Sequence, residues 1–76
     1  MATHELDNRG LTPPEPMVRI LGGLAALGPG DELEALMDRE PMLLYPELER
    51  RGFRWTCGPM PGSEEGFLLA ITRLAQ

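Results

Sequence analysis

Few side chains in this 76-residue chain could do chemistry, and they are scattered along it. Cys57 is the only thiol, and His4 is the only histidine. Asp38 and Glu40 are two acids separated by one residue and could form a carboxylate pair, although before a helix this spacing is more typical of a turn and a helix cap. One histidine, one cysteine and scattered carboxylates do not have the spacing of a metal site, so we expect no metal and no other cofactor.

The sequence around Cys57 allows two interpretations. Residues 53–57 alternate large apolar with polar residues, which predicts a strand with Phe53, Trp55 and Cys57 on its core face. In that position Cys57 is a small buried hydrophobe, and this is the interpretation we favour. A thiol beside Gly58 at a strand end can instead be exposed, which makes Cys57 a candidate reactive thiol.

A helix start is indicated at residues 12–15. Thr12 can accept from free amides of the first turn, and Glu15 stands three residues later, as in a capping box. Apolar residues then recur at three- and four-residue steps over 17–27, which predicts a helix with one apolar face, ended by residues 28–30. Gly22 and Gly23 in its middle favour a close approach to the sheet. Free amides at a helix start can bind an anion, but here prolines remove two of them.

The other segments predict strands over 4–7, 32–38, 53–57 and 67–74, and a second helix over 41–51. Leu33, Ala35 and Met37 share one strand face, and Pro46 indicates either a kink or a helix that starts near Tyr45. Residues 58–66 are rich in Pro and Gly and predict a turn. The run 67–71 is apolar throughout, as in a central strand buried on both sides. The order β-α-β-α-β-β predicts an α/β fold, specifically an α+β two-layer sandwich with a four-stranded mixed sheet and two helices on one face.

Length and charge narrow the classes of protein. The chain fits a single domain, 1–76, in which we expect residues 1–3 to be disordered. The net charge of −5 argues against a nucleic acid as partner, because phosphate contacts dominate that affinity. No apolar run reaches the ~20 residues of a membrane span, so we expect no membrane association. The polar N-terminus and the single cysteine favour a reducing, cytoplasmic location.

A short motif precedes the first predicted helix: residues 6–12 read LDNRGLT and residues 13–16 read PPEP. It resembles the opening of the TusA/SirA-like sulphur carriers, which is Leu-Asp-x-x-Gly-Leu-x followed by Cys-Pro-x-Pro. Three of these four positions agree, and Pro13 stands where the family has its cysteine. The resemblance marks a candidate motif at the start of the first helix: Gly10, Leu11, Thr12, Pro13, Pro14, Glu15 and Pro16.

The second half is more similar to a TusA-related branch of unknown function that lacks the carrier cysteine. That branch has an Asp-x-Asp-Pro-x-x-Leu-Tyr stretch, here residues 38–45, a Trp in the third strand, here Trp55, and a following Gly-Pro, here residues 58–59. It often carries Arg-His-Pro near the first helix, where this chain has residues 15–17 (EPM). The resemblance spans residues 6–73.

The resemblance implies a protein that keeps the TusA-like fold but cannot carry sulphur. TusA-like carriers hold a persulphide on a cysteine at the start of the first helix, where the helix dipole and free amides stabilise a thiolate. Pro13 offers neither sulphur nor an N–H. We therefore expect a non-catalytic protein of unknown cellular role that has lost sulphur transfer and binds a protein partner or a second copy of itself.

One face of the predicted sheet is left without helices. Leu36 interrupts its polar pattern, and the last strand adds either Leu68 and Ala70 or Phe67 and Leu69. Leu36, Leu68 and Ala70 form the candidate interaction surface, although scattered apolar surface, or a face covered by a dimer or an attached domain, is an alternative. Two other functions stay open: a sulphur-relay or redox protein that uses Cys57, and a regulatory nucleic-acid-binding protein, which the acidic charge opposes.

Overall fold

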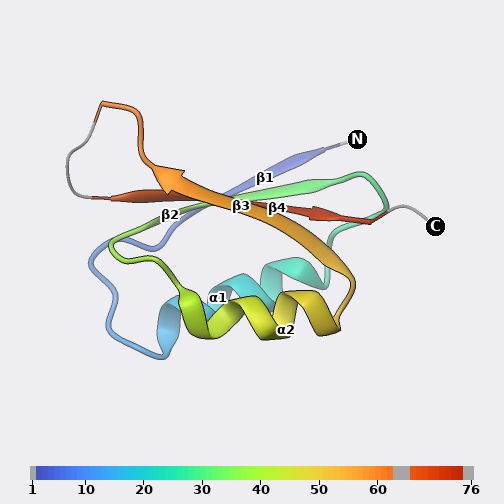
Figure 1. Cartoon of the computed structure of the whole chain (residues 1–76), viewed down its shortest axis with the longest axis horizontal. Helices are drawn as coiled ribbons and strands as arrows, with labels where there is room; N and C mark the ends of the chain where they lie inside the picture. Colours follow the sequence, from blue (N-terminus) through green and yellow to red (C-terminus); the bar gives the residue numbers. More distant parts are fainter. Residues whose placement is uncertain (1, 63–65, 75–76) are drawn as a thin grey trace.

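Four strands and two helices follow one another in the predicted order (Figure 1). The computed structural model describes residues 2–62 and 66–74. Its elements are β1 (Thr3–Asp7), α1 (Glu15–Leu24), β2 (Glu32–Met37), the 3₁₀ helix η1 (Met42–Leu44), α2 (Tyr45–Arg50), β3 (Phe53–Pro59) and β4 (Phe67–Arg73).

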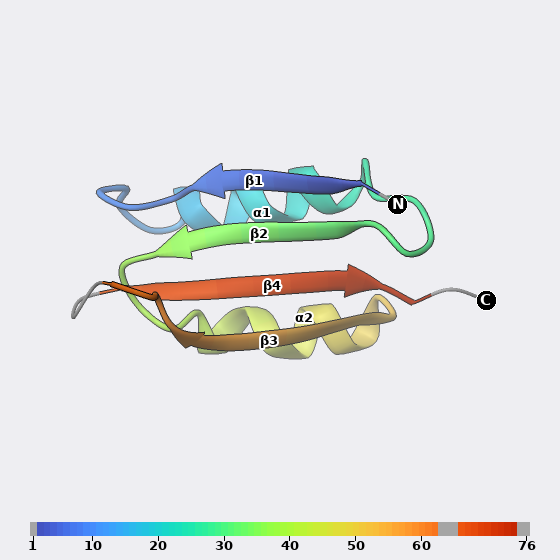
Figure 2. The same cartoon turned by 90° about the horizontal axis from the view of Figure 1, so that it is seen from above.

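The sheet is mixed and its strands lie in the order β1-β2-β4-β3 (Figure 2). β1 and β2 are parallel because α1 carries the chain back between them, and β4 is antiparallel to both of its neighbours. The continuous apolar run thus forms a central strand, as predicted, but it is not buried on both sides. Leu69 and Ile71 are buried against the helices, whereas Leu68 and Ala70, on the face opposite the helices, are half-buried. Both helices lie on one face of the sheet, with α1 beneath β1 and β2 and α2 beneath the other two strands. The fold is therefore the α/β two-layer sandwich expected from the sequence.

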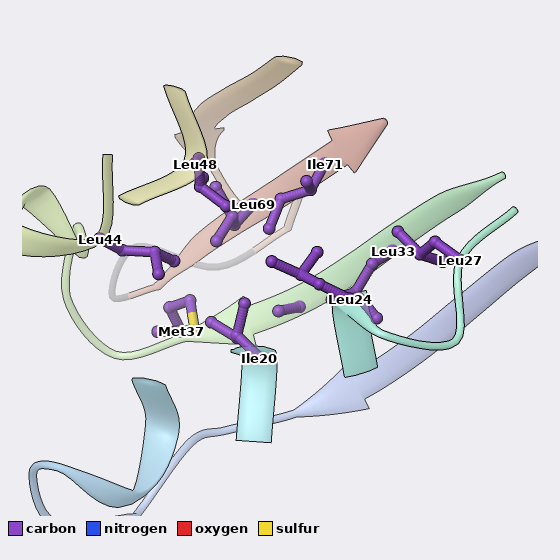
Figure 3. Packing of buried hydrophobic residues seen from close by; sticks show 10 residues of the cluster. Ile20, Leu24, Leu27, Leu33, Met37, Leu44, Leu48, Leu69 and Ile71 are labelled. Carbon is purple, nitrogen blue, oxygen red and sulfur yellow. The ribbon is translucent and has the colours of Figure 1, made fainter. Parts of the chain in front are cut away.

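The core lies between the sheet and the helices (Figure 3). Leu33, Ala35 and Met37 are buried on the helix-facing side of β2, as their alternation predicts. Apolar side chains of both helices pack against them. The buried cluster consists of Ile20, Leu24, Leu27, Leu33, Ala35, Met37, Leu44, Leu48, Leu69 and Ile71.

Only one of the two mid-helix glycines permits close packing. A Cβ at Gly23 would lie 3.5 Å from Leu33 Cδ2 and 3.7 Å from Leu6 Cδ1, so at this position the backbone of α1 approaches the sheet closely. A Cβ at Gly22 would meet nothing within 4 Å. The predicted reason for the glycine pair therefore holds at Gly23 and not at Gly22.

The first helix begins later than the sequence pattern indicates. Pro14 is its N-cap and makes no side-chain cap bond, so the predicted capping box is wrong. Thr12 contributes its carbonyl instead, which accepts from Glu15 N at 3.0 Å. Proline lacks an N–H and restricts the residue before it, which prevents helix through residues 12–14. The second helix begins at Tyr45 after a separate 3₁₀ turn, the second of the two outcomes that Pro46 allowed.

The two edge strands, β1 and β3, are each longer than predicted. Thr3, for which we expected no element, belongs to β1, and the Ala2 carbonyl accepts from Glu32 N at 2.9 Å. Met1 is outside the described residues. β3 continues to Pro59, which removes residues 58–59 from the predicted turn. Within the described ranges, none of the helices is both long and apolar enough to cross a membrane.

Candidate functional site

A cavity lies where two parallel strands end and two helices begin. Asn8 follows β1 and Asp38 follows β2, and because these strands are parallel both residues lie at the same end of the sheet. The starts of α1 and η1 face this end. Between them is a cavity of about 500 Å³, a size typical of ligand sites. In open α/β sheets the carboxyl ends of strands are a common place for such sites.

Five of the seven candidate motif residues line this cavity: Leu11, Thr12, Pro13, Pro14 and Pro16. Gly10 is not among them, but it holds the loop in place. Its φ is +79°, and its N–H donates to Asp38 Oδ2 at 2.6 Å, which joins the loop after β1 to the loop after β2.

The start of α1 is poor in hydrogen-bond donors. Pro13, Pro14 and Pro16 have no N–H, and the Glu15 N–H already donates to the Thr12 carbonyl. An anion at this helix start therefore receives no support from the geometry. The cavity is instead lined mainly by apolar side chains, among them Met17, Ile20 and Met37.

A buried asparagine lies in the cavity wall. Only 2% of Asn8 is exposed. Its Nδ2 donates to Pro16 O at 3.1 Å and lies 3.6 Å from Met37 Sδ, and both partners line the same cavity. Among the described residues, its Oδ1 has no hydrogen-bond partner. A buried acceptor without a partner is unusual and calls for an explanation.

Asn8 was missed in the sequence because it looks like a turn residue. The signal that could have found it is the two-residue period of β1. Asn8 is in phase with Leu6 and His4, both half-buried, so continuing the strand by one step points its side chain toward the helices. The Asn8 N–H does continue the ladder, since it donates to Leu36 O at 2.9 Å.

The mouth of the cavity carries two exposed apolar side chains, Met42 and Leu43, which we call the rim. Met42 is 65% exposed and Leu43 is 84% exposed, and both line the cavity. The next residue, Leu44, is fully buried in the core. Large apolar side chains exposed beside a cavity are typical of a binding surface.

Cys57 and the motif at the helix start are not brought together. Cys57 is half-buried on the helix-facing side of β3, in phase with Phe53 and Trp55 as predicted. It does not line the cavity. β3 and β1 are opposite edges of the sheet, separated by three inter-strand spacings of ~4.8 Å, or roughly 14 Å.

The surroundings of Cys57 are aromatic. Trp55 stacks on Tyr45, with ring centroids 5.2 Å apart. The Tyr45 hydroxyl donates to Glu40 Oε2 at 3.0 Å. Burial raises the pKa of Tyr45, and Cys57 and Glu40 raise it further. Glu40 therefore pairs with Tyr45, whereas Asp38 binds the loop after β1, and the two acids do not form a carboxylate pair.

The open face of the sheet holds the candidate interaction surface. Leu36 and Leu68 are cross-strand neighbours there, and Ala70 is opposite Glu34. All three are half-buried, and Glu5 and Glu34 line the same shallow cavity as the two leucines. The last strand thus leaves Leu68 and Ala70, not Phe67 and Leu69, on the open side. Across residues 2–62 and 66–74, no cluster of three or more metal-ligating side chains occurs.

The chain matches one known protein family. The match is to a family described as an uncharacterized conserved protein, DUF2249, and it covers residues 5–69. It therefore includes the whole motif, both helices and the rim of the cavity. Comparisons with curated proteins and with solved structures gave no match.

Proposed function

We propose that this chain, which belongs to the uncharacterized conserved family DUF2249, is a non-catalytic, TusA-like module that binds a protein partner at the end where α1 and η1 begin. The observation that carries the proposal is an apolar cavity with an exposed apolar rim at the place where the resemblance puts a carrier thiol. At that place the chain has Pro13.

The rim contributes little to folding and is available for binding. Leu43 is 84% exposed, so it removes little apolar surface from water within the chain. A partner that covered it would bury that surface at roughly 25 cal/mol per Å². Met42 is unbranched and adapts its shape, as methionines at binding surfaces do. These properties favour contact with a protein over contact with a small polar substrate.

The positions of the possible nucleophiles support a role without sulphur transfer. Pro13 has no sulphur, and Cys57 lies on the far edge of the sheet beside Tyr45. The alternative with Cys57 as a relay or redox thiol has less support, because no cavity-lining motif residue adjoins it. The nucleic-acid alternative has less support because the net charge is −5.

The docking proposal can be tested with one rim variant and two controls. Proteins are recovered from the native cell extract on the immobilised chain, and binding of each recovered protein is then measured in purified form. We expect Leu43→Glu to weaken binding at least tenfold, because a charge replaces a buried apolar contact. Leu68→Glu on the open face and Cys57→Ser should bind as the unchanged chain does. Loss of binding in Leu68→Glu alone would move the docking site to the open face.

The loss of sulphur transfer needs a separate test. The chain is incubated with a cysteine desulphurase and radiolabelled cysteine, and protein-bound label is measured before and after reduction. We expect none on the unchanged chain, whereas Pro13→Cys places a thiol at the family position and provides the comparison. Reducible label on the unchanged chain that disappears in Cys57→Ser would contradict the proposal.

A further inference from the structure

We propose that the cavity at the starts of α1 and η1 receives the indole ring of a tryptophan from the partner, and that the ring N–H donates to Asn8 Oδ1. This inference rests on the docking proposed above and adds the chemistry of the partner's anchor. It starts from the unpaired acceptor in the cavity wall and from the apolar side chains around it.

The hydrogen-bonding state of Asn8 defines what the cavity lacks. Asn8 Nδ2 donates one hydrogen to Pro16 O and directs the other toward Met37 Sδ. These bonds fix which end of the carboxamide is nitrogen, so the unpaired atom is the oxygen. Leaving such an acceptor unpaired away from water carries a desolvation penalty. A ligand group that donates here removes that penalty.

The ligand should carry a donor and no acceptor. A hydroxyl or an amide would bring an acceptor of its own next to Asn8, and Asn8 has no donor left to satisfy it. The other polar side chains that line the cavity, Thr12, Asp38, Arg39 and Glu40, are exposed, so in the described part of the chain its buried part offers no other side-chain donor. A charged donor would bury its charge beside a neutral oxygen, which is costly. The indole N–H is the one side-chain group that is neutral and donor-only. The rest of the indole ring is apolar.

The walls suit such a ring. Met17 and Met37 line the cavity, and thioether sulphur makes favourable contacts with aromatic rings. Ile20 and Leu44 add apolar surface, and the exposed rim can close over the backbone that bears the ring. Tryptophan is also among the residues most often found as anchors of protein interfaces.

Entry of the ring requires a small rearrangement. Asn8 Oδ1 is buried in the unbound structure. Met17 lines the cavity, is half-buried and is unbranched with several rotatable bonds, so it can move aside at low cost while Met37 keeps its contact with Asn8 Nδ2. We therefore expect the Met17 methyl group to report binding together with the Asn8 carboxamide.

The test uses two small ligands of nearly equal shape. N-acetyl-tryptophanamide carries the N–H, and its benzothienyl analogue has sulphur in that position. The full-length chain labelled with nitrogen-15 is titrated with each. Asn8 is the only asparagine, so the carboxamide signal that disappears in Asn8→Leu is identified without ambiguity. We expect the Asn8 signal to shift with the tryptophan compound and the analogue to bind about tenfold more weakly.

The variant Asn8→Leu should bind the two ligands equally. If that variant does not fold, the comparison of the two ligands on the unchanged chain still decides. Equal affinities on the unchanged chain, or binding without a shift of the Asn8 carboxamide, would overturn the proposal. Binding of free indole but not of the amide would overturn a protein source for the ring. If Leu43→Glu no longer binds the partner but the two ligands bind with equal affinity, the docking surface is supported and the tryptophan anchor is contradicted.

Discussion

At the scale of single residues, Leu43 and Leu44 are neighbours in the sequence with opposite surroundings. Leu44 is fully buried, and Leu43 is 84% exposed. We predict that Leu44→Ala lowers the free energy of unfolding by about 2–5 kcal/mol, because it leaves a cavity in the core. Leu43→Ala should change it by less than about 0.5 kcal/mol. Urea denaturation of both variants measures the difference.

The size of the Leu44 effect matters because the domain is small. A chain of this length has a net stability of roughly 3–5 kcal/mol, so Leu44→Ala removes most of it. If Leu43→Ala is as stable as the unchanged chain, rim variants can be used in binding experiments. Similar losses of stability in both variants would show that the rim belongs to the core and would remove it as a docking surface.

Tyr45 provides a second prediction at this scale, since it is the only tyrosine and its ionisation can be followed alone. Burial raises its pKa above the ordinary value of 10.0, with further contributions from Cys57 and Glu40. Above pH 10 the unfolded chain therefore loses a proton that the folded chain keeps, so folding stability falls as the pH rises. Phenolate absorbance should show no native titration near pH 10, and the urea-unfolded chain provides the control. A native midpoint near 10 would contradict the raised pKa of Tyr45.

At the scale of elements, the two helices depend differently on glycine. Gly22 lies in the middle of α1 with open space around it, so Gly22→Ala should stabilise the fold by up to about 1 kcal/mol through helix propensity. Gly52 follows α2 with φ +83°, and Gly52→Ala should cost about 1–2 kcal/mol although nothing lies nearby. Thermal unfolding of the pair is the measurement. Equal shifts in the same direction would contradict the backbone argument.

Elements were predicted well where one period or one composition dominates. The alternation of Leu33, Ala35 and Met37 predicted a strand face that is buried, and the apolar run of β4 predicted a central strand. The start of α1 was predicted wrongly, because a side-chain pattern at Thr12 was outweighed by the backbone limits of two prolines. Residue propensities alone do not show whether a capping side chain or a proline decides where a helix begins.

The cavity could be predicted only in part. The resemblance marked the helix start, but the partners of that segment are far away in the sequence. Gly10 binds Asp38, which is 28 residues later, and the rim follows at Met42 and Leu43. Only the parallel pairing of β1 with β2 brings these loops together. The unpaired Asn8 oxygen depends on hydrogen bonds that no local pattern specifies.

At the scale of the whole molecule, the three candidate sites lie at different places of the fold. The helices cover one face of the sheet (Figure 1). The cavity and its rim lie at the end of the helix layer where α1 and η1 begin. The open face carries Leu36, Leu68 and Ala70 beside acidic residues, and Cys57 lies at the far edge strand. A variant at one of these places can thus be made without touching the other two. This separation is what makes the controls Leu68→Glu and Cys57→Ser informative.

Stability against acid is a property of the whole chain and gives the last prediction. Within residues 2–62 and 66–74, three carboxyl groups have lowered pKa values in the folded state. Hydrogen bonds from Arg9 lower the pKa of Asp7 to about 2, those from the amides of Gly28 and Ala2 lower the pKa of Asp31, and Arg50 lowers the pKa of Glu47.

Each of these groups binds protons more readily in the unfolded chain than in the folded one. The stabilisation is therefore complete above the ordinary values of 3.8 and 4.5, and it is lost as the pH falls toward about 2. High salt should weaken the part due to Asp7, which forms an exposed ion pair, because the Debye length falls to about 3 Å at 1 M. The part due to Asp31 should persist, because its partners are backbone amides at 2.9 Å fixed in the fold. Urea denaturation of Asp7→Asn and Asp31→Asn across this range, at low and high salt, separates the two. If the acid loss in Asp31→Asn equals that of the unchanged chain at high salt, the link between Asp31 and the N-terminal strand does not stabilise the fold.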